Sequence, residues 1–382
     1  MGNRKAVESV GLIMIMATNG LQQFFHNKRV LITGHTGFKG AWLAHVLANW
    51  GARIVGVALE PHVSPNLYDT LGLARRIDSR ILDIRNFSEL QAVFEKEKPE
   101  IVFHLAAQAI VRESYRDPLR TIAVNTLGTG HILEAIRHTP SVKSAVLITT
   151  DKVYENKEWL YSYRENDRLG GQDPYSASKS SADIIIASYT QSFFHPEQFQ
   201  KNHHTLLAAC RAGNVIGGGD WSPDRLVPDF IRAVFEKKRA LSMRNPHSIR
   251  PWEYVLEPIS GYCLLAKKLY EGDTRCVGAW NFGPHDESFV TAEEMIQKAI
   301  HISGRGEYRV EFDHGMHEST LLKLDIAKAK TVLGWKPIFD LEQNLRFTLD
   351  WYRTYYENKE HIVKFTDAQI DLFFDMFAAR IA

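Results

Sequence analysis

One stretch decides the fold of this chain: Arg29-Val-Leu-Ile-Thr-Gly-His-Thr-Gly-Phe-Lys-Gly40. Its first five residues form a short apolar run, which predicts a buried strand. Three glycines follow at three-residue spacing, and residues 41–50 have the composition of a helix. A strand, a glycine turn and a helix therefore come in the order that a phosphate-binding βα unit requires.

The three glycines have separate roles. Gly34 allows a tight turn, Gly37 lets the backbone approach a pyrophosphate, and Gly40 lets helix and strand pack closely. The helix N-terminus adds free N–H groups and a positive dipole end. An ordinary strand-to-helix turn is the alternative, but a second strand at residues 53–59 follows at βαβ spacing. We therefore expect dinucleotide contacts from Gly34, Thr36, Gly37, Phe38 and Gly40.

Strands and helices continue to alternate along the chain. Further strands are predicted at 80–84, 101–105, 144–149 and 206–210, and helices at 88–96, 118–139 and 175–194. This alternation predicts an α/β fold, a doubly wound parallel sheet of the Rossmann-like type with helices on both faces. Ligands of such sheets gather at the carboxyl ends of the strands.

Composition limits the classes of function. The chain has 382 residues, 45% of them hydrophobic, enough for a large core and a second, smaller domain. A net charge of +1 argues against a nucleic-acid partner. The three cysteines have neither C-x-x-C spacing nor a neighbouring histidine cluster, so we predict no metal site and no disulfide. No apolar run is long enough to cross a membrane, and we expect a soluble, cytoplasmic protein without a membrane partner.

The chain is predicted to divide into three parts. Residues 1–24 form an N-terminal extension, either disordered or created by a start codon upstream of the true one at Met14 or Met16. Residues 25–210 form the nucleotide-binding domain, to which a segment near 242–272 returns. Residues 211–382 are mostly a substrate-binding domain. The intact mass of the native protein tests the start-codon hypothesis.

Distinctive residues follow the predicted strands. Asp83 is placed to accept from an adenine amino group, although a solvated acid fits the sequence equally well. The small side chains of Ala106 and Ala107 would let a cofactor lie against the backbone. The cofactor contacts predicted in this part of the chain are Asp83, Ile84, Ala106, Ala107, Gln108 and Asn125. The strand at 144–149 is followed by Thr150, Asp151 and Lys152.

Tyr175 and Lys179 stand four residues apart at the start of a predicted helix. This spacing puts both on one face, where the ammonium can lower the pKa of the phenol and make it a base near neutrality. Alone, such a pair is usually an ordinary solvated contact. Together with the glycine turn upstream, it predicts hydride-transfer chemistry.

Two later segments are candidates for substrate contacts. Residues 211–221 are rich in glycine but lack a strand-turn-helix order, so we interpret them as a substrate loop. Arg244 and Arg250 lie among turn residues and could clamp a diphosphate, because guanidinium binds its oxygens bidentately. Surface arginines are the alternative. The predicted substrate contacts are Asn214, Arg225, Arg244 and Arg250.

Several motifs together resemble the extended short-chain dehydrogenase/reductase family and, within it, the sugar-nucleotide 4,6-dehydratases. They are Thr33-Gly-x-x-Gly-x-x-Gly40, Thr150-Asp-Lys-Val-Tyr154 and Tyr175-x-x-x-Lys179. The segments 151–156, 163–167, 211–221 and 249–252 are most similar to the branch that acts on CDP-glucose. The resemblance runs from about Phe25 to beyond Trp335.

The resemblance implies an NAD-dependent dehydration without net oxidation. Tyr175, assisted by Lys179, would take the proton of the sugar 4-hydroxyl while C4 gives hydride to the nicotinamide, and Thr150 would hydrogen-bond the same oxygen. Asp151 would protonate the departing 6-hydroxyl, and Lys152 would remove the C5 proton or stabilise the enolate. Hydride then returns to C6. The implied pathway is deoxyhexose synthesis for a surface polysaccharide such as the O-antigen of lipopolysaccharide.

Two positions depart from the pattern of the wider family. dTDP-glucose dehydratases carry glutamate where this chain has Lys152, whereas the CDP-glucose branch carries lysine. Many members end the second strand with an aspartate for the adenosine ribose, where this chain has Ala58, with Glu60 two residues beyond. We therefore expect NAD to be loosely held.

Other functions remain open at this point. A dehydratase for dTDP-glucose or GDP-mannose would use the same motifs, because nothing in the spacing distinguishes the nucleotide base. A 4-epimerase would need no acid at C6, so Asp151 argues against it. A nucleotide-sensing protein would need no hydride-transfer base, so Tyr175 argues against that function. The resemblance also implies a homodimer or homotetramer, formed through helices near 121–137 and 176–194.

Overall fold

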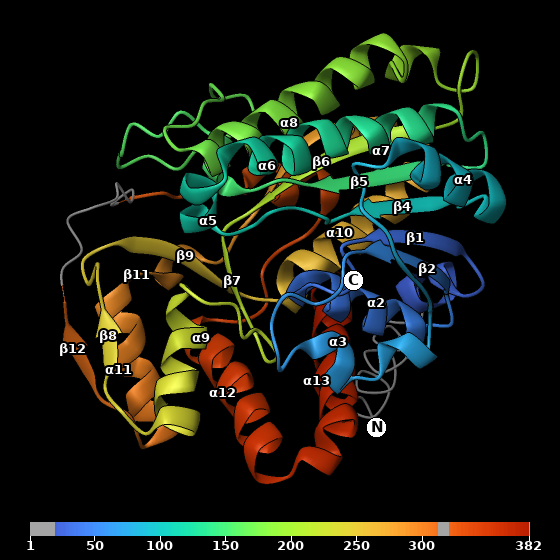
Figure 1. Cartoon of the computed structure of the whole chain (residues 1–382). Helices are drawn as coiled ribbons and strands as arrows, with labels where there is room; N and C mark the ends of the chain where they lie inside the picture. Colours follow the sequence, from blue (N-terminus) through green and yellow to red (C-terminus); the bar gives the residue numbers. More distant parts are fainter. Residues whose placement is uncertain (1–19, 312–320, 382) are drawn as a thin grey trace, which may run out of the picture.

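A parallel sheet organises the protein, which is described here by a computed structural model covering residues 20–311 and 321–381 (Figure 1). Seven strands lie in the order β10-β6-β5-β4-β1-β2-β3, and every neighbouring pair is parallel. Their bounds are β1 Arg29–Thr33, β2 Arg53–Ala58, β3 Asp78–Ile81, β4 Ile101–His104, β5 Ser144–Ile148, β6 Leu206–Ala212 and β10 Gly278–Phe282.

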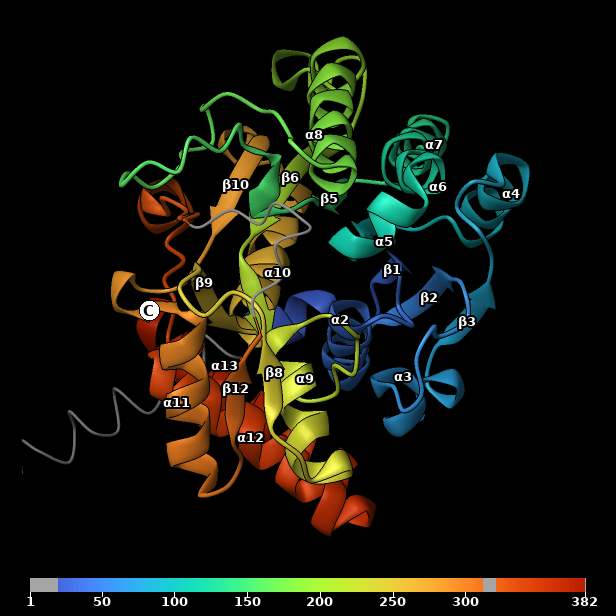
Figure 2. The ribbon, with the colours of Figure 1, turned by 60° about the vertical axis from the view of Figure 1, so that its left-hand side comes forward.

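Helices cover both faces of this sheet (Figures 1 and 2). One face carries α4 (Phe87–Glu97), α6 (Pro118–Ile122), α7 (Gly128–Arg137) and α8 (Pro174–Ser192), and the other carries α2 (Phe38–Asn49), α10 (Leu256–Tyr270) and α13 (Ile362–Ile381). Successive strand residues point to opposite faces. Val30 and Ile32 accordingly join the core beneath α2 and α10, while Leu31 joins the core on the α8 side. The predicted fold class is therefore confirmed.

A smaller unit lies at the carboxyl edge of the sheet. It contains two short sheets, β11-β9-β7 and β12-β8. Its strands are β7 Asn214–Ile216, β8 Leu241–Met243, β9 Ile249–Tyr254, β11 Phe289–Thr291 and β12 Tyr308–Val310. Its helices are α9 Leu226–Ile231, α11 Ala292–Ser303 and α12 Leu341–Glu357, and the short helices α3 Leu67–Thr70 and α5 Val111–Arg116 lie in loops of the larger unit.

The chain crosses between the two units more often than its sequence indicates. Helix α10 packs on the large sheet and β10 is one of its strands, so the segment that returns extends to Phe282, beyond the predicted 242–272. Asp367 of α13 also accepts a hydrogen bond from His45 Nε2 of α2 at 2.7 Å. The last helix thus packs on the nucleotide-binding unit, which a single boundary at residue 210 does not anticipate.

Three element boundaries differ from those predicted. The strand expected at 80–84 is β3, which ends at Ile81, so Asp83 lies in the following loop. The helix expected at 118–139 is divided by a π-helical turn at Ala123–Leu127. The strand β6 continues to Ala212, so Arg211 lies in a buried strand and not in a substrate loop. Pairing with neighbouring strands defines β3 and β6, and local composition does not reveal that pairing.

Part of the predicted N-terminal extension belongs to the fold. Residues 20–25 are helical, and the side chains of Leu21 and Phe25 are buried in the core. Burial of these apolar side chains joins residues 20–25 to the core. The hypothesis of a start at Met14 or Met16 concerns residues outside the described part.

Within residues 20–311 and 321–381, no helix combines the length and the hydropathy needed to span a membrane.

Candidate active site

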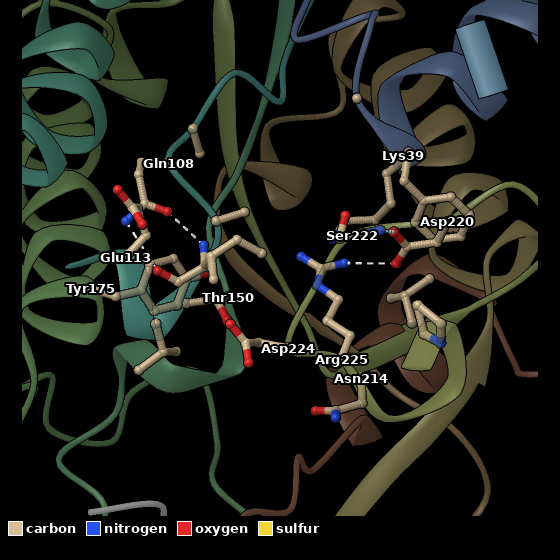
Figure 3. Close-up of a pocket in the computed structure, with 18 of the residues that line it drawn as sticks. Lys39, Gln108, Glu113, Thr150, Tyr175, Asn214, Asp220, Ser222, Asp224 and Arg225 are labelled. Atoms are coloured by element: carbon tan, nitrogen blue, oxygen red, sulfur yellow. Dashed lines mark hydrogen bonds and ion pairs between the residues drawn. The ribbon is translucent and has the colours of Figure 1, made fainter. Parts of the chain in front are cut away.

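A cavity of about 740 Å³ lies between the carboxyl edge of the large sheet and the smaller unit. It brings together residues from the glycine turn, from the carboxyl ends of β2, β3, β4, β5 and β6, from the start of α8 and from the loops around β7, β8 and β9. Figure 3 shows Thr150, Tyr175 and Gln108 on one side and Lys39, Asp220 and Arg225 on the other. All of the predicted site residues line this cavity except Asn125.

The glycine turn has the close packing that its spacing predicts. Gly34 adopts a left-handed φ of 78°, and a Cβ there would lie 2.7 Å from the backbone nitrogen of Ala106. A Cβ on Gly40 would lie 2.0 Å from the carbonyl oxygen of Gly34. Gly37 is the N-cap of α2, and no side chain of the described residues caps that helix end. The N-terminus of α2 therefore faces the cavity as an anion site without a protein anion on it.

The ends of β2 and β3 form the side of the cavity where an adenosine would lie. Ala58 and Glu60 both line it, and the Thr36 hydroxyl donates to the carbonyl of Leu59 at 2.8 Å. Asp83 also lines it, but its carboxylate already accepts from Arg85, at 2.6 Å from Nη2. That ion pair lowers the pKa of Asp83. The Asp83 carboxylate is thus held as an anion by its neighbour in the loop.

Asn125 acts behind the cavity and not within it. Its side chain is buried and binds the backbone of Gln108 twice, accepting from N–H at 2.8 Å and donating to the carbonyl at 3.0 Å. Its amide also donates to Ser178 of α8 at 2.9 Å. Asn125 is therefore not among the residues that line the cavity, and its direct contact with a cofactor stays a prediction. Asn125 lies in the π-helical turn, and its amide bonds the Gln108 backbone. A sequence pattern does not show this orientation.

Tyr175 and Lys179 share one face of α8, as predicted, but their electrostatics differ from expectation. Burial raises the pKa of Tyr175 to about 12, opposed by a hydrogen bond with Thr150. Burial, with the nearby cation of Lys39, lowers the pKa of Lys179 to about 7. The Lys179 ammonium donates to the carbonyl of Ile148 at 2.9 Å. In the protein alone, desolvation of the phenol outweighs any effect of the lysine, so the expected lowering is not present.

Asp151 is a buried carboxyl group next to this pair. Its Oδ1 accepts from the Thr150 hydroxyl at 3.0 Å, and its Oδ2 has no hydrogen-bond partner among the described residues. Burial raises the pKa of Asp151, against the opposing effect of Lys152. A raised pKa favours the protonated carboxyl group, which suits a general acid. Lys152 lines the same cavity.

The smaller unit supplies three of the arginines that line the cavity. Arg250 is buried in β9 and donates to the carbonyl of Ile249 at 2.9 Å. Arg225 donates to Asp220 at 3.1 Å, and Arg244 donates to Asp224 at 3.0 Å. The four predicted substrate contacts thus all belong to the smaller unit and line the cavity.

Several cavity residues were not predicted. Lys39 stands inside the glycine turn, and its pKa is lowered to about 8 by burial. Three arginines of α5 and α6 stand four residues apart, a spacing that could have indicated one surface facing a ligand. The unpredicted polar residues include Lys39, His62, Arg112, Glu113, Arg116, Arg120, Asp220 and Asp224.

Comparison with known sequences identifies relatives along almost the whole chain. The sequence profile of the family described as GDP-mannose 4,6 dehydratase matches residues 31–348. The CDP-glucose 4,6-dehydratase of Salmonella typhimurium is 42% identical over 343 residues, which are 90% of this chain and 95% of that protein. The dTDP-glucose 4,6-dehydratase of the same organism is 27% identical, over 85% of this chain and 92% of that protein.

Solved structures share the fold at lower identity. A dTDP-glucose 4,6-dehydratase from Bacillus anthracis, solved in complex with NAD, has a TM-score of 0.72 at 21% identity and covers 88% of this chain and 99% of its own. A UDP-glucose 4-epimerase from Thermotoga maritima, solved with UDP-glucose, has a TM-score of 0.72 at 22% identity and covers 86% and 99%. Dehydratases and epimerases thus share this architecture, and the fold alone does not separate them.

Proposed function

Because this chain belongs to the GDP-mannose 4,6-dehydratase family of extended short-chain dehydrogenases/reductases, we propose that it dehydrates CDP-D-glucose to CDP-4-dehydro-6-deoxy-D-glucose. One observation carries the choice of dehydration over epimerisation. Asp151 is a buried carboxyl group whose pKa is raised. Its Oδ2 accepts no hydrogen bond from any described residue. An epimerase has no need of a proton donor at C6, whereas loss of the 6-hydroxyl requires one.

NAD fits the groove that begins at the glycine turn. Gly34 and Gly40 leave no room for side chains, and the uncapped N-terminus of α2 suits a diphosphate. Glu60, at the end of β2, is the carboxylate that would reach the adenosine ribose in place of the aspartate that Ala58 replaces. When bound, NAD supplies the hydride acceptor and donor of the reaction.

Tyr175 and Thr150 would act on the 4-hydroxyl of the sugar. Tyr175 Oη takes its proton, and the Thr150 hydroxyl holds the same oxygen. Since burial keeps the pKa of Tyr175 at about 12, the phenol needs a neighbouring positive charge to become a base near neutrality. Lys179 contributes when protonated, and its carbonyl contact with Ile148 holds the ammonium in place.

Lys152 and Asp151 would carry out the elimination from the 4-keto sugar. The ketone acidifies the C5 proton, which Lys152 Nζ removes, and Asp151 Oδ2 gives its proton to the departing 6-hydroxyl. The two side chains are adjacent in the chain and line one cavity, as a 5,6-elimination requires. Asn214, Arg225, Arg244 and Arg250 would hold the nucleotide diphosphate of the substrate.

We also propose a cytoplasmic homodimer or homotetramer that serves deoxyhexose synthesis for O-antigen. Apolar side chains are exposed on the outer helices of the large unit, namely Leu119 and Ile122 of α6, Leu127 of the π-helical turn and Ile184 of α8. Burying such a group against a second copy would remove its apolar surface from water. Sedimentation of the purified protein tests this association.

Incubation with three substrates tests the proposed activity. The purified protein and NAD are mixed separately with CDP-glucose, dTDP-glucose and GDP-mannose, and products are followed by mass and by the absorbance of 4-keto sugars in alkali. Loss of one water from CDP-glucose alone is expected. Loss of water from another substrate would reassign the nucleotide, and an isomer of unchanged mass would indicate an epimerase.

A further inference from the structure

Asp224 lies between two arginines, one from each unit of the protein. Arg244 follows β8 in the smaller unit, and its Nη1 donates to Asp224 Oδ1 at 3.0 Å. Arg112 belongs to α5 of the large unit, and its Nε lies 3.9 Å from the same oxygen. All three residues line the cavity. One carboxylate oxygen therefore links cations of both units across the cleft.

Hydrogen bonds to other segments hold the loop that carries Asp224 at Gly218 and Asp220, shortly before Asp224. The Trp42 indole donates to the carbonyl of Gly218 at 2.9 Å, and the Tyr352 hydroxyl contacts both the N–H and the carbonyl of Asp220. Arg225, the next residue, is turned toward Asp220, while Asp224 points away from it (Figure 3). The loop thus presents the Asp224 carboxylate to the cavity as a separate group.

The backbone conformation of Asp224 and a neighbouring ion pair both bear on its contact with Arg244. Asp224 has a left-handed φ of 61°, which aspartate and asparagine tolerate better than most residues with a side chain. Asp229, another carboxylate near Arg244, is paired with Arg232. Asp224 thus contacts Arg244 and also approaches Arg112.

We propose that Arg112 and Arg244 form a diphosphate-binding subsite and that Asp224 is an internal anion that occupies it until a ligand arrives. A diphosphate offers more charge and more acceptor oxygens than one carboxylate, so it displaces Asp224 from both guanidinium groups. A ligand with a single phosphate gains less from the same exchange. Asp224 thereby selects diphosphates over monophosphates, at the cost of weaker binding overall.

Replacing Asp224 by asparagine tests the competition directly. Asp224→Asn keeps the shape of the side chain and the tolerance for a left-handed φ while removing the charge. The matched control is Asp350→Asn, which changes the net charge equally by breaking a surface pair with Arg353 on α12. Calorimetry measures the binding of inorganic pyrophosphate, CDP and CMP to each protein, and thermal unfolding verifies that each is folded.

The expected result is tighter binding of pyrophosphate and CDP to Asp224→Asn by about fivefold, the upper value for one exposed ion pair. The control should not change binding. The ratio of the affinity for CDP to the affinity for CMP should fall only in Asp224→Asn. Arg112→Gln should weaken pyrophosphate binding. Unchanged or weaker binding in Asp224→Asn would overturn the proposal, as would unchanged binding in a folded Arg112→Gln.

The natural ligand of this subsite depends on the proposed function, because only a sugar nucleotide brings the diphosphate. The two can still fail separately. Tighter pyrophosphate binding in Asp224→Asn, without turnover of CDP-glucose by the wild-type protein, would refute the proposed function alone. Turnover of CDP-glucose with unchanged pyrophosphate binding in Asp224→Asn would refute the subsite alone.

Discussion

Asp183 and Arg211 form a bidentate ion pair in the core, directly behind the catalytic segment. Arg211 Nη2 donates to Asp183 Oδ1 at 2.7 Å, and Arg211 Nε donates to Oδ2 at 2.9 Å. The Thr149 hydroxyl donates to the same Oδ2 at 2.9 Å. Since Thr149 precedes Thr150 and Asp183 lies one turn after Lys179, the pair joins the end of β5 to the helix that carries Tyr175.

Breaking this pair from one side should destabilise the protein strongly. Asp183→Asn leaves a buried guanidinium without its carboxylate, which costs about 3–5 kcal/mol in comparable cases. Urea denaturation should show this loss. The double variant Asp183→Asn with Arg211→Met should recover part of it, because no unpaired charge remains. A loss below about 1 kcal/mol in the single variant would contradict the interpretation of a buried, charged pair.

Replacing Asp151 by asparagine should stop the elimination while leaving oxidation at C4 possible. A positioned proton donor contributes roughly 10²–10⁴-fold, so formation of the 4-keto-6-deoxy product should fall by that factor. Reduced cofactor absorbance should then accumulate during a single turnover. Asp350→Asn, at a position that is not among the cavity-lining residues, serves as the control. Full activity of Asp151→Asn would remove this residue from the mechanism.

Lys179 should make stability depend on pH. Its pKa falls from 10.5 in the unfolded chain to about 7 in the folded protein, so the unfolded state binds more protons between these values. The contribution of Lys179 to stability therefore rises with pH in that window, by up to about 1.4 kcal/mol per pH unit, and is constant at lower pH.

Comparison with Lys179→Met isolates this contribution, because other buried groups such as Lys39 remain in both proteins. The unfolding free energy of wild type minus that of the variant should increase between about pH 7 and about pH 10.5 and stay level in more acidic solution. Urea titrations at several pH values measure it. A level difference over the whole range would show that Lys179 titrates normally in the folded protein.

Two glycine substitutions should have opposite effects. Gly40→Ala would place a Cβ 2.0 Å from the Gly34 carbonyl oxygen, so the turn must open and both cofactor binding and stability should fall. Gly130→Ala lies in α7 with no atom within 4 Å of the new Cβ and should raise stability by roughly 0.5–1 kcal/mol. Calorimetric binding of NAD and thermal unfolding distinguish the two. Unimpaired binding of NAD to Gly40→Ala would contradict the close packing of the turn.

Local patterns predicted the elements that depend on nearby residues. The order of strand, glycine turn and helix, and the shared face of Tyr175 and Lys179, follow from spacings of three or four residues. Elements that depend on distant partners were missed or misplaced. Strand β10 pairs with β6, which lies about seventy residues earlier in the chain. Arg211 is buried in the core, where it forms an ion pair with Asp183.

The sequence by itself determined the class of fold and the residue types available for chemistry, because backbone geometry and side-chain identity are local properties. Only the tertiary structure decided their electrostatic state. It raises the pKa of Tyr175 to about 12, leaves Asp151 Oδ2 without a partner among the described residues, and brings Asp224 between Arg112 and Arg244. Burial and charge proximity depend on which distant segments surround a group, and only the folded chain specifies them.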